Sequence, residues 1–265
     1  LDLYSHATVN QQQAALQVIK KIKKYIDRVY AIFPFEVDFY AKHGVEAVYV
    51  GNPSVQTVQK GQKGLPTREV FLQQNNLPEK PLIALLPGSR KQEVVDSIRV
   101  FSQLKQSDCE GYQLVMAATS AVSPALYAHV PHHIRIVYDQ TYSLLAHAVV
   151  GAINSGTATL ETALFKLPQV VCYGVKFSRI ALLLKPLLIK IPYVSLVNII
   201  AQKELVKELL GHHFKATALT QELQRLLHDK AYRNRILAHY DAIAQSLGTA
   251  VASDTAAKDI MVASH

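Results

Sequence analysis

The stretch that decides the fold is Leu82–Val94, which reads LIALLPGSRKQEV. Five apolar residues of strand length stop at Pro-Gly-Ser-Arg, and a charged segment with helical spacing follows. Strands that are apolar on both faces and alternate with amphipathic segments, of which Glu93–Leu104 is one example, predict a doubly wound, Rossmann-like parallel sheet. The other apolar runs of strand length are Gln113–Ala118, Ile134–Val137, Ala148–Ile153 and Gln169–Tyr173.

The segments on either side of this region have different patterns. Ahead of it, the sequence predicts strands at Arg28–Phe33 and Val45–Val50 with a helix at Glu36–His43 between them, which is too little for a complete sheet. After residue 204 we expect the chain to be wholly helical. We therefore predict three segments: a partial α/β piece at residues 1–52, the Rossmann-like domain at residues 53–228, and C-terminal helices at residues 229–265 that pack back toward the N-terminal side.

Composition and charge narrow the functional classes. The 265 residues are 49% hydrophobic and 18% charged, as in ordinary globular proteins. Two cysteines are too few for a disulfide framework and favour a reducing compartment. The net charge of +8 favours an anionic partner: nucleic acid, an acidic lipid surface or a phosphorylated substrate. Because no signal-peptide pattern or membrane-spanning run occurs, we expect a cytoplasmic protein that touches a membrane only from that side.

The turn after the first strand is a candidate anion site, because ligands of open α/β sheets bind beyond the carboxyl ends of the strands. Gly88 would let the backbone approach a ligand closely, and Ser89 adds a hydroxyl group. The helix that follows offers free N–H groups, and Arg90 offers a forked cation that suits phosphate oxygens. The alternative is a plain turn with a surface arginine.

A second junction of the same kind follows the strand Ala148–Ile153. Residues 154–161 read NSGTATLE, in which Ser155, Gly156 and Thr157 could cradle a phosphate and Glu161 could face the same crevice. The alternative is that one of the two hydroxyl groups caps the helix. Two such junctions in one sheet favour a nucleotide diphosphate as ligand, although no GxxxxGK[ST] loop occurs.

A third candidate region is Lys176–Ile200, which is rich in Leu and Ile with interspersed cations. It suits an interfacial segment at a lipid surface about as well as a core helix with solvated lysines. Asn198 is a polar residue among apolar ones in this region. Such a residue can satisfy local backbone groups or point into the crevice.

Four stretches of the sequence, taken in order, resemble the lipid-A-disaccharide synthase family, whose members are inverting glycosyltransferases of GT-B architecture. The resemblance runs over roughly residues 17–260. The stretches are DRVYAIFPFEVDFYAKHGVEAVYVGNP (27–53), LPGSRKQEV (86–94), NSGTATLETALFKLPQVVCYG (154–174) and IPYVSLVNIIAQKELVKELL (191–210).

The resemblance implies a peripheral enzyme on the cytoplasmic face of the Gram-negative inner membrane. It would transfer 2,3-diacylglucosamine from UDP-2,3-diacylglucosamine to 2,3-diacylglucosamine 1-phosphate (lipid X), forming a β-1′,6 disaccharide 1-phosphate and UDP. No cofactor and no metal are expected, and no residue is assigned as general base. By motif match the UDP-sugar residues are Gly88, Ser89, Arg90 (which also stabilises the leaving UDP), Ser155, Gly156, Thr157, Glu161 for the ribose, and Asn198 in the same pocket.

The chain departs from the family pattern at its N-terminal end. It has no Trp, and residues 1–16 do not match, so we expect the donor-binding domain with only a remnant of the acceptor domain, and a truncated chain of weak or no activity. Two alternatives stay open: a module that binds a UDP-sugar without transfer, and a related GT-B enzyme acting on UDP-GlcNAc. Phospholipid headgroups and lipid X explain the positive charge without nucleic acid. The helices after Ala231 are candidates for exchange in a homodimer.

Overall fold

The computed structural model describes residues 17–154, 156–174 and 193–263. These residues cluster into two compact units, one made of residues 17–56 and 243–263 and the other of residues 57–174 and 193–242. The chain passes from one unit to the other within α3 (Pro53–Gln62) and within α11 (Lys230–Leu247). The predicted division at residues 52 and 228 stays a prediction.

The larger unit is built on a six-stranded parallel sheet with the strand order β5-β4-β3-β6-β7-β8. All five residues of β3 and of β7 are buried, as expected for strands covered on both faces. The predicted α/β class and parallel sheet are therefore confirmed. The strands are β3 (Leu82–Leu86), β4 (Gln113–Ala118), β5 (Ile134–Tyr138), β6 (Ala148–Asn154), β7 (Gln169–Tyr173) and β8 (Glu208–Leu210).

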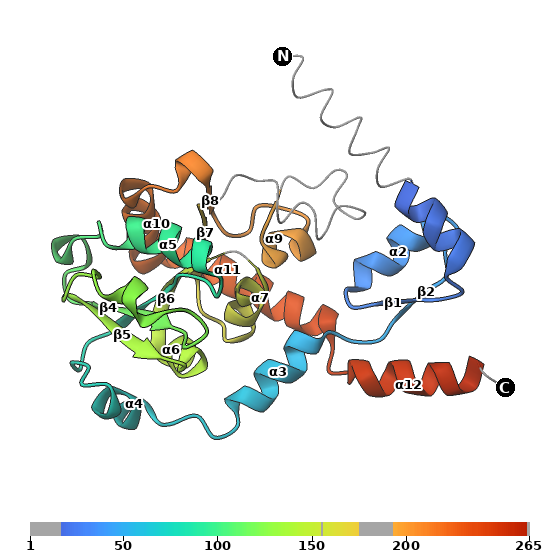
Figure 1. The fold of residues 1–265 in the computed structure, drawn as a ribbon, viewed down its shortest axis with the longest axis horizontal. Helices are drawn as coiled ribbons and strands as arrows, with labels where there is room; N and C mark the ends of the chain where they lie inside the picture. The colour runs from blue at the N-terminus through green and yellow to red at the C-terminus, as the bar shows by residue number, and fades with distance from the viewer. Residues whose placement is uncertain (1–16, 155, 175–192, 264–265) are drawn as a thin grey trace, which may run out of the picture. The chain divides into compact units, whose positions relative to one another are not determined.

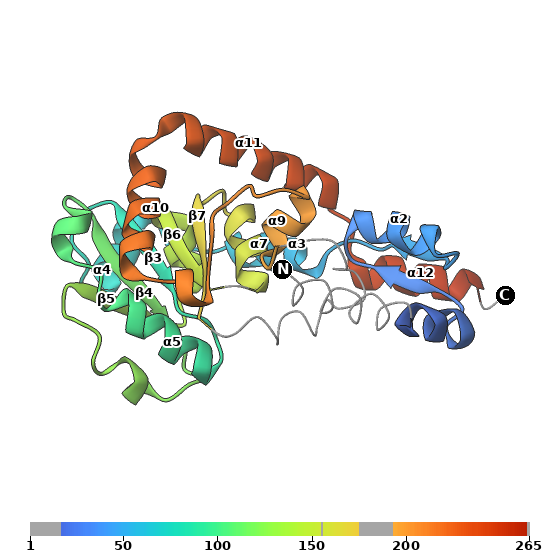
Figure 2. The same ribbon diagram turned by 90° about the horizontal axis from the view of Figure 1, so that it is seen from above.

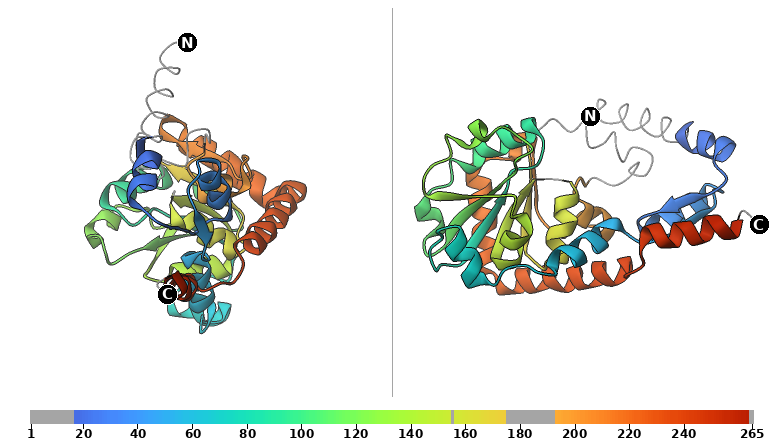
Figure 3. Two further views of the ribbon diagram at one scale, coloured as in Figure 1. Left: turned by 90° about the vertical axis from the view of Figure 1, so that its right-hand side faces the viewer. Right: turned by 60° about the horizontal axis from the view of Figure 1, so that its bottom comes forward.

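Helices cover both faces of this sheet (Figures 1 and 3). α5 and α10 lie on one side, while α4 and α6 lie on the other. After β3 the chain adds β4 and β5 toward one edge of the sheet, and it then returns to add β6, β7 and β8 toward the other edge. The strand order therefore reverses between β3 and β6, which makes this pair the switch point of the sheet. The helices are α4 (Arg68–Gln74), α5 (Lys91–Phe101), α6 (Thr141–His147), α7 (Thr157–Leu164), α9 (Leu196–Ala201) and α10 (Ala216–His228), with short 3-10 turns at Gln106–Cys109, Pro124–Tyr127 and Gly211–His213.

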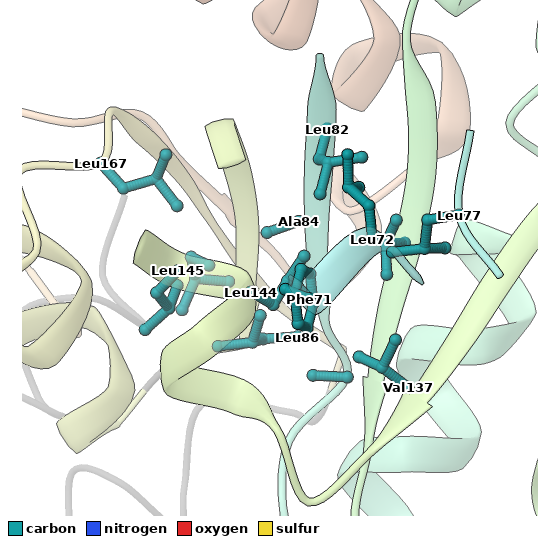
Figure 4. Close-up of a cluster of buried hydrophobic side chains, with 13 residues drawn as sticks. Phe71, Leu72, Leu77, Leu82, Ala84, Leu86, Val137, Leu144, Leu145 and Leu167 are labelled. Carbon is teal, nitrogen blue, oxygen red and sulfur yellow. The ribbon is translucent and has the colours of Figure 1, made fainter. Parts of the chain in front are cut away.

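The core under α4 and α6 holds the sheet in place (Figure 4). Alternate residues of β3 point toward it, as the two-residue period of a strand requires. Burying each large apolar side chain contributes about 1.5–3 kcal/mol, so this layer supports the rigid strand ends on which a site can be built. The labelled members are Phe71, Leu72, Leu77, Leu82, Ala84, Leu86, Val137, Leu144, Leu145 and Leu167.

The smaller unit contains a two-stranded parallel sheet of β1 (Val29–Ala31) and β2 (Ala47–Tyr49), joined through α2 (Pro34–Lys42). Residues 17–25 are helical, and α12 (Ala252–Ala263) lies beside the strands (Figure 2). Arg28 connects parts of this unit that are far apart in the sequence, because its guanidinium contacts Asp259 of α12 at 2.7 Å and Glu46 at 2.8 Å. Both strands are shorter than predicted, but the strand–helix–strand order is as expected.

One expectation is wrong: the chain does not become wholly helical after residue 204. Glu208–Leu210 form β8, which pairs with Val171–Tyr173 at the edge of the sheet. The strand has only three residues and begins with a charged one, so it lacks the apolar run that marks the other strands. The helical C-terminal end is confirmed by α10, α11 and α12. In the part of the chain that the structure describes, no helix has both the length and the apolarity needed to cross a bilayer.

Candidate functional site

A cavity of about 360 Å³ lies at the switch point of the sheet, within the larger unit. Its walls come from the carboxyl ends of three neighbouring strands, β4, β3 and β6, and from the first residues of α5, α6 and α7. This is where open α/β sheets bind ligands, and the volume lies in the ordinary range for small-molecule sites. The lining residues are Leu86, Pro87, Gly88, Ser89, Arg90, Glu93, Ala117, Ala118, Thr119, Thr141, Asn154, Gly156, Thr157, Ala158 and Glu161.

Gly88 makes the turn between β3 and α5 possible. Its φ is +102°, a left-handed backbone conformation that other residues adopt only with strain. A Cβ atom here would lie 2.8 Å from the Cβ of Glu93 and 3.2 Å from the Cγ of Asn154. The glycine therefore keeps the cavity floor open as well as turning the chain.

Glu93 organises the start of α5. Its Oε2 accepts long hydrogen bonds from the backbone N–H groups of Ser89 (3.4 Å) and Arg90 (3.3 Å), in the manner of a capping box. Its Oε1 contacts the Arg90 Nη1 at 3.1 Å. The Arg90 side chain is nevertheless 72% exposed, so most of its donors face solvent and remain available to an anion.

The second junction places the start of α7 against the same cavity. Gly156 precedes the helix with φ +133° and ψ −156°, a region that is essentially restricted to glycine. Thr157 is the first residue of the helix and is exposed. The N-termini of α5 and α7 thus both border the cavity, and each contributes the positive end of its helix dipole.

Glu161 lies one turn into α7 and lines the cavity. Burial raises its pKa, while a hydrogen bond from the Tyr142 hydroxyl acts in the opposite direction. Burial and the neighbouring carboxylate raise the pKa of Tyr142 to about 12. The pair therefore consists of a hydroxyl donor that stays protonated at neutral pH and a carboxylate with acceptor capacity to spare.

The structure does not bring Asn198 to this cavity. The residue is fully buried in α9, and its Nδ2 donates to the Val206 carbonyl and to Glu208, each at 2.9 Å. Its Oδ1 accepts from the N–H groups of Leu205 (2.9 Å) and Val206 (3.0 Å). With both donors and the acceptor used, the side chain fixes the segment before β8.

Ser155 and residues 176–192 of the apolar, cationic region lie outside the described residues. Of the other predicted site residues, the structure gathers Gly88, Ser89, Arg90, Gly156, Thr157 and Glu161 around one cavity. Sequence reasoning missed Glu93, although a glutamate three residues after a helix start is a known capping signal. Within the described ranges, no cluster of three or more His, Cys, Asp or Glu side chains could hold a metal ion.

Known proteins resemble this chain in sequence over most of its length. The lipid-A-disaccharide synthase of Anaeromyxobacter dehalogenans is 31% identical over 251 residues, covering 91% of this chain and 64% of the relative. That of Coxiella burnetii is 30% identical over 246 residues, with the same two coverages. The chain thus spans 64% of the length of these relatives.

Solved structures share the fold at low identity. UDP-GlcNAc 2-epimerase from Neisseria meningitidis bound to UDP-GlcNAc matches with a TM-score of 0.57 and 10% identity, covering 89% of this chain and 61% of that one. A UDP co-structure of MnaA from S. aureus matches with a TM-score of 0.59 and 11% identity, covering 86% and 57%. At these identities the likeness shows the fold alone.

The model of the family described as lipid-A-disaccharide synthetase matches residues 14–260, nearly the whole chain. It includes both strand-to-helix junctions, the segment of Asn198 and the strands of both units. Together with relatives at 30–31% identity over 91% of the chain, this match establishes the family. The chain belongs to the lipid-A-disaccharide synthetase family.

Proposed function

We propose that this chain provides the UDP-sugar site of a lipid-A-disaccharide synthase. The reaction is transfer of 2,3-diacylglucosamine from UDP-2,3-diacylglucosamine to 2,3-diacylglucosamine 1-phosphate, with inversion, giving the β-1′,6-linked disaccharide 1-phosphate and UDP. The observation that carries the proposal is the meeting of two helix N-termini, an open glycine turn and Arg90 around one cavity at the switch point of the sheet.

Each part of the cavity has a role that follows from its chemistry. The N-termini of α5 and α7 attract the diphosphate, with Gly88 and Gly156 allowing backbone and ligand to approach closely. The hydroxyl groups of Ser89 and Thr157 donate to phosphate oxygens, and the motif match in the sequence extends this role to Ser155. Glu161 accepts hydrogen bonds from the ribose hydroxyls, since a carboxylate accepts from two donors at once. We assign Asn198 no direct contact with the donor, because its hydrogen bonds are all internal.

Arg90 has the central part in the chemistry. Breaking the bond between the anomeric carbon and the UDP oxygen leaves negative charge on UDP. A guanidinium and two helix dipoles that face this charge stabilise the transition state more than the ground state. Arg90 keeps free donors for this role because Glu93 engages only one of its nitrogens. We assign the general base that activates the acceptor hydroxyl to no residue of this chain.

The partners and the location follow from the same proposal. Both substrates carry acyl chains, so the enzyme would meet them at the cytoplasmic surface of the inner membrane. The net charge of +8 suits such an anionic surface. Co-sedimentation with vesicles of anionic lipid, compared with neutral vesicles, tests this placement. A homodimer is the proposed assembly, and sedimentation velocity tests it.

A second candidate function is donor binding without transfer. The observation in its favour is that the chain spans 64% of the length of its relatives. Both candidates predict UDP binding, and only the first predicts disaccharide formation. An enzyme that acts on UDP-GlcNAc would instead use this sugar nucleotide, which carries no long acyl chains. It would either release UDP from it or convert its sugar to an epimer.

The test combines a titration with a transfer assay. Isothermal titration of the chain with UDP should show binding, and uridine should bind more weakly because it lacks the diphosphate. Incubation with UDP-2,3-diacylglucosamine and lipid X, followed by mass analysis of the lipid product, separates transfer from binding alone. If the chain bound neither UDP nor uridine, the proposed site would be wrong.

A further inference from the structure

Asn154 occupies an unusual position at the floor of the cavity. It is the last residue of β6, is only 2% exposed and lines the cavity beside Gly88. Its Nδ2 donates to the Ser97 Oγ of α5 at 3.0 Å. Its Oδ1 is buried and has no hydrogen-bond partner among the described residues.

Buried polar atoms without partners are rare, since each loses its hydrogen bonds to water on folding and gains none within the protein. Two other side chains in the described part of the chain share this property, through the Ser102 Oγ and the Gln169 Oε1. Neither of them lines the cavity. Of these three side chains, Asn154 is thus the one with which a ligand in the cavity could form a hydrogen bond.

The partner of Asn154 allows its amide to take either orientation. A serine hydroxyl both donates and accepts, so Ser97 can hold the amide nitrogen or, after a half-turn of the amide, the amide oxygen. In the turned form, Oδ1 accepts from Ser97 and the Nδ2 hydrogens are left for the cavity. There the N-termini of α5 and α7 and the side chain of Arg90 favour an anionic oxygen, which needs a donor rather than an acceptor.

We propose that Asn154 is a phosphate-binding residue of the site, which turns its amide when a nucleoside diphosphate enters and donates from Nδ2 to a phosphate oxygen. Ser97 is the positioning residue that holds the amide in the turned form. This inference rests on the proposed UDP-sugar function. It adds a side-chain donor at the end of β6 to the two helix N-termini that border the cavity. It also explains why β6 ends in a buried amide whose oxygen has no hydrogen-bond partner among the described residues.

The experiment compares the affinities for UDP and uridine in the full chain by isothermal titration. Asn154→Ala should weaken UDP binding about tenfold or more, as expected for a hydrogen bond to a charged group, and leave uridine binding within about twofold. Asn154→Asp keeps the shape but cannot donate at neutral pH and adds a negative charge, so it should weaken UDP further. Ser102→Ala, which removes a buried unpaired hydroxyl away from the cavity, is the matched control and should change neither affinity.

A second measurement follows the amide itself. In a nitrogen–proton correlation spectrum, the side-chain NH₂ signals that vanish in Asn154→Ala should shift when UDP is added to the wild type and stay in place with uridine. Ser97→Ala should lower the affinity for UDP without altering that for uridine. Melting curves from circular dichroism establish that each variant is folded.

The outcomes separate this inference from the proposed function. A wild-type chain that binds neither UDP nor uridine overturns both. A wild type that binds UDP, with an Asn154→Ala variant that binds it equally well, overturns the role of Asn154 alone. Equal losses for UDP and uridine would mean that Asn154 only shapes the cavity, and would also overturn the inference.

Discussion

Replacing Gly88 by alanine tests whether the turn between β3 and α5 is as tightly built as the structure indicates. The change adds one methyl group at a residue with φ +102°. That methyl group would lie 2.8 Å from the Cβ of Glu93 and 3.2 Å from the Cγ of Asn154. The Cβ of Glu93 is fixed to the first turn of α5 and cannot swing aside, so the backbone of the turn has to shift.

Two terms make up the expected loss. A non-glycine residue in this backbone region costs about 1–3 kcal/mol. Forcing a methyl group into occupied space costs about 1–3 kcal/mol more. We therefore expect Gly88→Ala to lower the free energy of unfolding by about 2–6 kcal/mol, a large part of the total of about 5–15 kcal/mol for an ordinary domain.

Gly64→Ala is the matched control, because Gly64 has φ +87° but, apart from its own residue and its two chain neighbours, no atom lies within 4 Å of the position that its Cβ would take. Alanine also restricts the unfolded chain at both positions, so this effect cancels in the comparison. Urea unfolding followed by circular dichroism should show Gly88→Ala to be less stable than Gly64→Ala by about 1–3 kcal/mol. If the two variants unfolded at the same urea concentration with the same slope, the close packing of Glu93 and Asn154 on Gly88 would be refuted.

Three further predictions concern the residues around the cavity and Asn198. Arg90→Ala should weaken UDP about tenfold or more by titration while sparing uridine, because a charge-assisted contact with phosphate is lost; equal losses for both ligands would contradict it. Because burial raises the pKa of Glu161, its carboxylate becomes protonated at a higher pH than that of an ordinary glutamate. The affinity for uridine should therefore fall as the pH drops from neutral, and in Glu161→Gln this affinity should not change with pH over the same range. Asn198→Ala should lower the free energy of unfolding by about 2–4 kcal/mol in urea, since buried backbone N–H groups lose their acceptor; an unchanged midpoint would argue against its structural role.

Most of the sheet could be predicted from the sequence because buried strands appear there as runs of apolar residues. A strand covered on both faces is apolar along most of its length, so β3 and, after Gln113, β4 appear as apolar runs. Their bounds match the predicted ones at every residue. β8 could not be found in this way. It begins with Glu208, a charged residue that hides the strand in the sequence. In the fold its carboxylate accepts hydrogen bonds from the Ser195 N–H and hydroxyl and from Asn198.

The candidate site could be predicted in part, because a glycine at the end of a strand marks a turn whose place on the sheet edge follows from the topology. Gly88 and Gly156 were found in this way, and both take positive φ angles. The roles of polar residues nearby could not be read from the sequence. The spacing of Glu93 signals a capping role, but how closely its side chain packs on Gly88 and Arg90 depends on distances of a few ångströms across the turn, which no spacing rule contains.

Asn154 and Asn198 show what decides such roles. Both are asparagines, both follow apolar runs, and both are buried, at 2% and 0% exposure. Asn198 uses its two donors and its acceptor within the fold, so a ligand could bind it only by breaking bonds that hold β8. Among the described residues, Asn154 leaves an acceptor without a partner beside a cavity that two helix N-termini border. The residue type is the same, and the difference in unsatisfied hydrogen-bonding capacity marks Asn198 as part of the scaffold and supports our proposal that Asn154 binds the ligand.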